Sequence, residues 1–381
     1  MSQGTLVGRL VHGIAEIDAA AWDALVPPDN PFLAHAFLAG LEASGSAATR
    51  TGWQPLHLVL EDGDRLIAAA PMYAKSHSYG EYVFDHGWAD GYERAGGSYY
   101  PKLQVAVPFT PVPGTRLLAR DAAARAALVS ALRTTLQQAQ LSSLHVTFCT
   151  EAESRQLGEA GFLQRRGIQF HWTNQGYGSF ADFMETLRSA KKKMVRKERQ
   201  QVAAAGVEIQ VLHGDSLTPE HLDAFFPFYR ATVDKRWGNA YLTRTFFRRL
   251  GSELRDRVVL VSAVKDGKMV GAALNVLGDT TLYGRLWGCL EEYKFLHFEA
   301  CYYAAIEFAI LRGLQRVEAG AQGVHKLHRG YAPVFTHSAH LITDPSFKSA
   351  VKRFLDQENE SLDAQMDELR AMLPYRSAEE D

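Results

Sequence analysis

The feature that most constrains the fold of this chain is a pattern of elements that occurs twice. Residues 56–73 contain two apolar runs of β-forming residues, separated at 62–64 by the sequence DGD, which suits a tight hairpin turn. The same design returns over 257–277, where the sequence KDGK at 265–268 separates two similar runs. We therefore expect a hairpin of paired strands in each half of the chain.

Each hairpin is followed, further along the chain, by the same order of helix and strand. A run of strong helix formers at 121–140 precedes a strand-like segment in the first half, and 299–312 precedes one in the second. Both halves continue to a glycine–aromatic pair, at 161–162 and at 330–331, and then to an extended run. Two copies of one α/β layout predict mixed sheets covered by helices.

The duplication divides the chain into modules and connecting helices. With 381 residues, of which 46% are hydrophobic and 22% charged, the chain is long enough for two domains. We expect a first module over 1–175 and a second module over 206–345. A basic connecting helix would occupy 176–205, and a C-terminal helix with its tail would occupy 346–381.

Composition argues against several classes of protein. A formal net charge of -2 gives no overall field that would attract nucleic acid or an anionic membrane, so any such attraction must be local. The three cysteines are too few and too scattered for a disulfide framework, which fits a reducing compartment. No stretch approaches the roughly 20 apolar residues of a membrane span. We therefore expect a cytoplasmic protein without a membrane-spanning segment.

Three long segments resemble a known family. They are YYPKLQVAVPFTPVPG at 99–114, FLHFEACYYAAIEFAI at 295–310 and EAGAQGVHKLHRGYAP at 318–333. They resemble the FemAB-like branch of the GNAT superfamily, proteins often described as peptidoglycan biosynthesis or recognition proteins, and the resemblance extends over nearly the whole chain. It implies an α/β fold with mixed sheets, built from two tandem GNAT-like (acyl-CoA N-acyltransferase) modules.

The resemblance also implies a class of reaction. The better-understood relatives, the peptide-bridge transferases of cell-wall synthesis, move an aminoacyl group from tRNA to an amine. An enzyme of this kind would transfer an acyl or aminoacyl group onto an amine of a small molecule or a cell-wall-type precursor. It would use aminoacyl-tRNA or acyl-CoA as co-substrate and hold no tightly bound cofactor. The alternative is a non-catalytic binding protein that recognises a cell-wall precursor or RNA, because fold does not fix function.

A strongly basic segment lies between the two modules. Seven of the twelve residues at 188–199 are Lys or Arg. On a helical wheel, four of them share one face: Arg188, Lys192, Arg196 and Arg199. We expect these four to bind a polyanion through its phosphates, although a solvated helix face is the alternative. Aminoacyl-tRNA is favoured over acyl-CoA, because 288–296 lacks the glycine-rich, basic loop that binds a CoA pyrophosphate at a helix N-terminus.

The densest group of functional side chains follows a strand of the second module. It comprises Glu318, Gln322, His325, Lys326, His328 and Arg329. Acyl transfer to an amine needs a base and donors for the developing oxyanion. Glu318 or a histidine would be the base, and Gln322, Lys326 and Arg329 would be donors or bind phosphate. The alternative is a glycine-rich turn with solvated charges. Two histidines at a spacing of three, without a third ligand, do not make a metal site, so no metal is expected.

Two further polar residues lie at the start of an apolar helix. His297 and Glu299 begin the segment that leads to Tyr302, where a strand meets a helix and open α/β sheets commonly hold ligands. We expect His297 and Glu299 to be catalytic together with Glu318 and Gln322, all facing one cavity. Tyr302 and His325 would contact the substrate. The alternative is a capping carboxylate beside a histidine with an ordinary structural role.

The first module contributes an irregular, proline-containing segment. Prolines at 101, 108, 111 and 113 exclude a helix and a central strand over most of 99–114. This segment would form an ordered wall that carries Tyr100 and Lys102. We expect both side chains to bind the substrate.

Overall fold

Both predicted hairpins are present. In the computed structural model, β3 (His57–Asp62) pairs with β4 (Arg65–Ala70), and β11 (Val258–Lys265) pairs with β12 (Lys268–Leu277), each pair antiparallel. In the second hairpin, Asp266 and Gly267 both have positive φ, as a type I′ turn requires. The structure describes residues 6–235, 238, 240–320 and 323–376.

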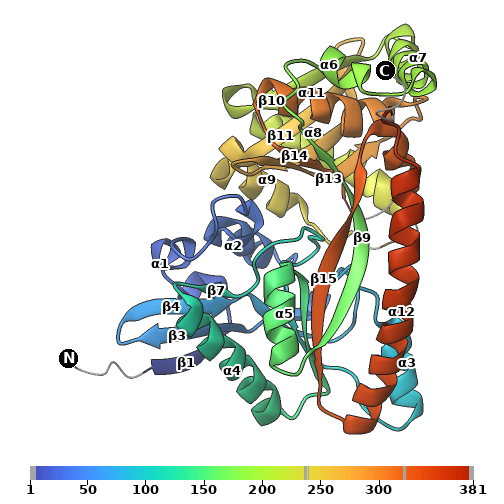
Figure 1. Cartoon of the computed structure of the whole chain (residues 1–381). Helices are drawn as coiled ribbons and strands as arrows, with labels where there is room; N and C mark the ends of the chain where they lie inside the picture. Colours follow the sequence, from blue (N-terminus) through green and yellow to red (C-terminus); the bar gives the residue numbers. More distant parts are fainter. Residues whose placement is uncertain (1–5, 236–237, 239, 321–322, 377–381) are drawn as a thin grey trace. The chain divides into compact units, whose positions relative to one another are not determined.

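The chain forms two units, and each is built from two stretches of sequence. The first unit is Met1–Gly167 with Phe335–Asp363, and the second is Ile168–Val334 with Ala364–Asp381. The chain leaves the first unit within β9 (Leu163–Thr173) and re-enters it within β15 (Ala332–Ile342), the two long strands coloured green and orange-red in Figure 1.

The first unit contains two sets of strands. An antiparallel sheet has the order β1-β3-β4-β7, with β1 at Leu6–Val11 and β7 at Leu118–Ala119. The other set has the order β15-β8-β6-β5-β2, in which only β6 and β8 run parallel. Its remaining strands are β2 (Trp53–Pro55), β5 (Met72–Lys75), β6 (Lys102–Val105) and β8 (Ser143–Cys149).

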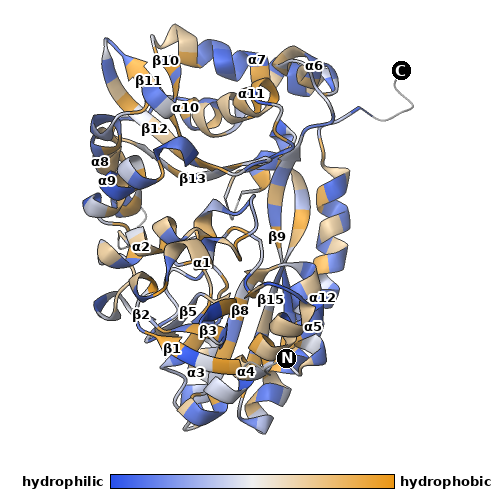
Figure 2. Cartoon of the chain, turned by 90° about the vertical axis from the view of Figure 1, so that its left-hand side faces the viewer, coloured by the Kyte–Doolittle hydropathy of each residue, from blue (hydrophilic) through white to orange (hydrophobic). Residues whose placement is uncertain are grey.

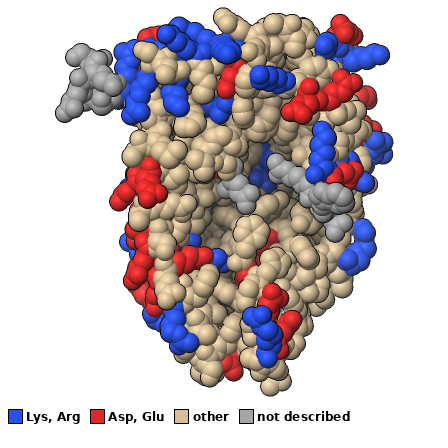
Figure 3. Space-filling model, turned by 90° about the vertical axis from the view of Figure 1, so that its right-hand side faces the viewer, with Lys and Arg blue, Asp and Glu red and all other residues tan. Residues whose placement is uncertain are grey.

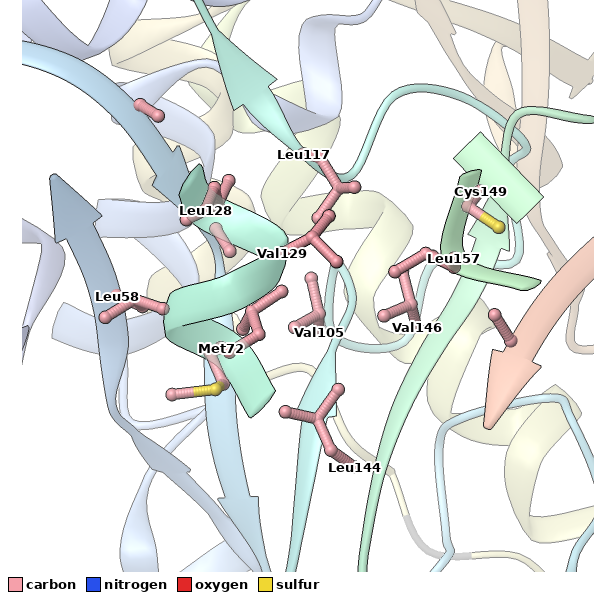
Figure 4. Close-up of a cluster of buried hydrophobic side chains, with 14 of the residues drawn as sticks. Leu58, Met72, Val105, Leu117, Leu128, Val129, Leu144, Val146, Cys149 and Leu157 are labelled. Atoms are coloured by element: carbon pink, nitrogen blue, oxygen red, sulfur yellow. The ribbon is translucent and has the colours of Figure 1, made fainter. Parts of the chain in front are cut away.

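One helix supplies much of the core of the first unit. The α4 helix (Ala122–Ala139) begins where the Asp121 carboxylate accepts a hydrogen bond from the Ala124 amide at 2.8 Å. Its buried leucines at 128, 132 and 136 recur every four residues and so share one face. Figure 4 shows Leu128 and Val129 among apolar side chains of the neighbouring strands. The other helices of this unit are α1 (Ala19–Asp23), α2 (His35–Ala43), α3 (His86–Arg94), α5 (Glu151–Glu159) and the first part of α12 (Pro345–Ala371).

The second unit has one mixed set of strands in the order β10-β11-β12-β13-β14-β9, with only β13 and β14 parallel. The strands not yet located are β10 (Glu208–His213), β13 (Thr281–Cys289) and β14 (Arg316–Glu318). Its helices are α6 (Phe180–Glu185), α7 (Ser189–Ala204), α8 (Pro219–Lys235), α9 (Arg244–Glu253), α10 (Leu296–Phe298) and α11 (Ala304–Leu311). A π-helical turn, η6 (Glu299–Tyr303), joins α10 to α11, and a 3-10 segment, η7 (Val324–Arg329), follows β14.

The two units exchange one strand each, because β9 and β15 both pair with strands of the unit formed by the other half of the sequence. β9 follows α5 of the first copy, yet it pairs with β14 of the second unit, with Thr173 opposite Arg316. β15 follows η7 of the second copy, yet it pairs with β8 of the first unit, with His340 opposite His145. The division therefore differs from the expected boundaries at 175, 205 and 345, because backbone pairing between distant segments decides which sheet a strand joins.

Helix α11 lies in the apolar core of the second unit. Ile306 and Ala309 are buried there with Trp172 of β9 and Leu282 of β13. The helix is coloured mostly as hydrophobic in Figure 2, whereas α7 is largely hydrophilic. No helix within the described part of the chain is both long and apolar enough to cross a membrane.

Candidate functional site

Three segments of the second unit bring most of the predicted polar residues together: η6, η7 and α7. The apolar helix begins with the π-helical turn η6, a local widening that is frequent at functional sites. The η7 segment lies between two glycines with positive φ, Gly323 at 120° and Gly330 at 88°. Glycine adopts this conformation without a steric penalty, so both ends of η7 can turn sharply.

His325 of η7 is exposed and oriented by Tyr302 of η6. Its Nε2 lies 2.8 Å from the Tyr302 hydroxyl. Its ring also lies against Gly323, where an added Cβ would fall 2.4 Å from Cε1, so only glycine fits. Burial, followed by the Arg329 guanidinium, lowers the pKa of His325 below its ordinary value. The imidazole is therefore neutral near pH 7 and able to accept a proton. The His297 ring packs 5.3 Å from the Tyr302 ring and 6.1 Å from that of His325.

Two buried cations, Lys326 and Arg329, follow this histidine on η7. Lys326 Nζ donates a hydrogen bond to the Gly320 carbonyl at 2.8 Å, and burial lowers its pKa to about 8. Arg329 lies 3.5 Å from the centroid of the Phe298 ring and donates through Nη1 to the His325 carbonyl at 2.8 Å. The second predicted donor on this stretch, Gln322, lies outside the described residues.

A buried carboxylate that the sequence analysis missed holds Arg329. Glu198 of α7 accepts hydrogen bonds from Arg329 Nη2 at 2.7 and 2.9 Å, and a third from the Tyr303 hydroxyl. It is the one acid among the basic residues of 188–199. The sequence signal for this buried ion pair was a single acidic residue among seven basic ones, because such a residue is expected to pair with a cation.

Glu299, predicted to be catalytic, is part of an ion-pair network with α7. Both of its carboxylate oxygens accept from Arg199 Nε, at 3.0 and 3.2 Å, and Arg199 Nη2 also donates to Glu307 at 2.9 Å. Burial raises the pKa of Glu299, and the Arg199 guanidinium opposes that effect. Glu299 and Arg199 therefore join two helices, and the catalytic role of Glu299 and the polyanion-binding role of Arg199 stay predictions.

Glu318, predicted to be the base, lies on the sheet. It is buried on β14, with Oε1 3.2 Å from Arg316 Nε and 3.7 Å from His171 Nδ1. Burial, with the charges of Arg316 and Lys326 next, lowers the pKa of His171 to about 3. Glu318 therefore pairs with a strand residue and a histidine of the sheet, and its place in one cavity with His297 and Glu299 stays a prediction.

The basic helix α7 presents a different set of cations from the one predicted. Lys192 is buried and donates to Glu185 at 2.5 Å, because Val195, Glu198 and Val202 set the inward face of the helix. Arg188 and Arg196 are exposed, and Lys193 and Lys197 are exposed as well. Figure 3 shows Lys and Arg gathered along the upper edge of the view, over α7. The outward face is therefore basic, but the predicted Lys192 and Arg199 are held within the protein by hydrogen-bonded ion pairs.

The predicted substrate-binding residues of the first unit belong to a separate buried cluster. Lys102 is 0% exposed, and its Nζ donates to Ser78 Oγ and Glu81 Oε2, each at 2.8 Å, and to Asp85. The three contacts take up all three ammonium protons of Lys102 and give it a structural role, and its predicted contact with a substrate stays a prediction. Tyr100 is half-buried, with its hydroxyl 2.8 Å from Ser78 Oγ, and stays a candidate.

This first-unit cluster extends to a pair of buried histidines. The Tyr99 hydroxyl donates to Asp85 at 2.7 Å and lies 3.2 Å from His145 Nε2, and His145 shares a 2.7 Å hydrogen bond with His340. Burial lowers the pKa of His145 to about 3. Lys75 lies beside Glu81 at 3.8 Å, and burial brings the pKa of each to about 7, downward for Lys75 and upward for Glu81. The sequence signal for this buried polar cluster was the presence of polar residues at alternate positions of β6 and β8, which places them on one face of the sheet.

Within the described residues, no group of three or more His, Cys, Asp or Glu side chains is arranged to hold a metal ion. The two histidines of η7 have different partners: His325 binds Tyr302, and His328 Nδ1 accepts from Lys191 Nζ at 3.1 Å.

The comparisons with known proteins identify the family. The profile of the FemAB-like family, described as peptidoglycan biosynthesis/recognition, matches residues 13–377. The chain belongs to the FemAB-like family. No curated protein matches it in sequence.

Solved structures show that this FemAB-like chain shares its fold with FemX and L-PGS. The crystal structure of FemX aligns with a TM-score of 0.56 at 10% identity, over 88% of this chain and 98% of that one. L-PGS from Bacillus licheniformis aligns with a TM-score of 0.51 at 9% identity, over 83% and 95%. A protein of unknown function from Bacteroides thetaiotaomicron aligns with a TM-score of 0.52 at 11% identity, over 89% and 100%. At sequence identities this low, the structural similarity shows a shared fold and does not show a shared activity.

Proposed function

We propose that this FemAB-like protein is an acyltransferase that moves an acyl or aminoacyl group onto an amine of a small molecule or cell-wall-type precursor. The family description supports a role in peptidoglycan biosynthesis or recognition. The observation that carries the proposal is His325, an exposed and neutral imidazole oriented by Tyr302, with Lys326 and Arg329 on the same short segment. A base beside two cations is what transfer to an amine requires.

In the proposed reaction, His325 is the general base. With Nε2–H donating to the Tyr302 oxygen, Nδ1 keeps its lone pair and takes a proton from the attacking amine. The new C–N bond forms as the carbonyl becomes an oxyanion, which the positive charge of Lys326 stabilises. The oxyanion then collapses, the bond to the donor's ester oxygen or thioester sulfur breaks, and the imidazolium returns its proton to that leaving group.

We further propose that the acyl donor is aminoacyl-tRNA. The exposed cations of α7, namely Lys193, Arg196 and Lys197, form its outward face together with Arg188 at its N-cap, and this basic surface suits a phosphate backbone. Acyl-CoA is the second candidate donor, with its phosphates on the same surface. In either case the co-substrate leaves after each turnover, and no bound cofactor takes part.

The test uses bulk tRNA labelled in its aminoacyl group, incubated with the protein and a panel of primary amines. We expect the label to move to an amine, and His325→Ala to slow this transfer by about 10²–10⁴-fold. His12→Ala, which alters an exposed histidine of the other unit, should leave the rate unchanged. If thiol is released from acyl-CoA while aminoacyl-tRNA stays charged, the assignment of aminoacyl-tRNA as donor is wrong, but the assignment of acyltransferase activity is kept. Transfer from neither donor would favour the non-catalytic binding protein.

A further inference from the structure

Helix α7 has two faces with different tasks. Its outward face carries the exposed Lys193, Arg196 and Lys197, whereas Val195, Glu198 and Val202 are buried on the inward face. The spacing explains the division, because residues three, four or seven positions apart lie on the same side of a helix. One rigid element therefore connects a solvent-facing set of cations to a buried carboxylate.

The inward face contacts the two segments that carry the candidate chemistry. Glu198 accepts from both Arg329 of η7 and Tyr303 of η6. Arg329 in turn donates through Nη1 to the carbonyl of His325, the candidate base, at 2.8 Å. A continuous chain of contacts thus runs from α7 through Glu198 and Arg329 to the backbone of His325. A second hydrogen bond joins the same two elements, from Lys191 Nζ of α7 to His328 Nδ1 of η7 at 3.1 Å.

We propose that Glu198 is a positioning residue that couples polyanion binding on the outward face of α7 to the placement of His325 and Lys326 on η7. The proposal rests on the proposed function, because that function makes the outward face the donor's binding surface. The Arg329–Glu198 contact is charge-assisted and its partners are buried, so its geometry is specific. A shift or stiffening of α7 on binding phosphates is therefore passed to η7, whose glycine ends allow it to respond.

The test compares hydrogen exchange of the backbone amides at 324–331 with and without bulk tRNA at low salt. In the wild-type protein, tRNA should slow this exchange. Glu198→Gln keeps the shape of the side chain but removes its charge, so tRNA should still bind with unchanged affinity while the slowing is lost. In the transfer assay the same variant should lower kcat and leave KM for tRNA unchanged.

Two further variants separate coupling from general damage. Tyr303→Phe removes one hydrogen bond to Glu198 and should weaken the slowing without abolishing it. Glu220→Gln, an exposed carboxylate of α8, should behave as the wild type does. If tRNA binds the wild-type protein and leaves exchange at 324–331 unchanged, or if Glu198→Gln keeps the full slowing, the coupling is refuted while the donor assignment stands. If tRNA does not bind the wild-type protein, both the assignment of aminoacyl-tRNA as donor and the proposed coupling are refuted.

Discussion

At the scale of single residues, Lys326 is the cation whose charge state matters most for the proposed reaction. Burial lowers its pKa to about 8, so the ammonium is present below that pH and lost above it. Lys326→Met should therefore reduce kcat by about 10²–10³-fold, the cost of removing one donor to an oxyanion. In the wild-type protein, kcat should fall as the pH rises through 8, and this limb should be absent from the residual activity of the variant.

The control for this prediction is Lys294→Met, which alters an exposed lysine of the same unit. It should leave both kcat and the pH profile unchanged. A wild-type rate that stays constant well above pH 8 would mean that the charge of Lys326 does not act on the reaction.

Lys102 is a residue whose task is structural. Its ammonium lies between Glu81 and Asp85, and all three side chains are buried. Although burial opposes it, the Lys102 ammonium lowers the pKa of Asp85. Lys102→Met should destabilise the protein by about 3–5 kcal/mol, because it leaves buried carboxylates without their cation. Urea unfolding measures this, with the exposed Lys268→Met as the matched change; equal losses in the two variants would contradict the prediction.

At the scale of elements, α7 provides the test of polyanion binding. Reversing the charge of its exposed residues, with Lys193→Glu, Arg196→Glu and Lys197→Glu combined, should weaken binding of bulk tRNA and flatten its dependence on salt, because fewer counterions are released. Binding titrations over a range of salt concentrations measure both effects.

The contrast within α7 is Arg199→Glu. Arg199 holds Glu299 and Glu307, so its reversal should lower the free energy of unfolding and change tRNA affinity much less than the outward triple variant does. Should Arg199→Glu abolish tRNA binding in a protein that unfolds like the wild type, the assignment of the two faces is wrong.

At the scale of the whole molecule, buried neutral histidines set the response to acid. Burial lowers the pKa of His145 and of His171 to about 3 and lowers that of His340 as well. Below pH 6.5 the unfolded chain takes up protons on these rings and the folded protein does not, so stability is lost as the pH falls from 6.5 toward 3. Each ring should contribute a slope of about 1.4 kcal/mol per pH unit.

Denaturant unfolding across this pH range measures the effect in both units, since His171 lies in one and His145 in the other. His171→Gln should reduce the slope, whereas His12→Gln, on the surface, should not. A stability that is flat between pH 6.5 and 4 would show that the buried rings accept protons without cost.

The sequence by itself determined the duplicated α/β layout, both hairpins and the family, because turn residues, hydrophobic period and long matching segments are local properties. It also placed His325, Lys326 and Arg329 on one short stretch. Only the tertiary structure decided which sheet β9 and β15 join, because the backbone of a strand can pair with any compatible neighbour. It also decided that Lys192, Arg199 and Lys102 face inward, since a charged side chain becomes structural only where a buried carboxylate from a distant segment meets it.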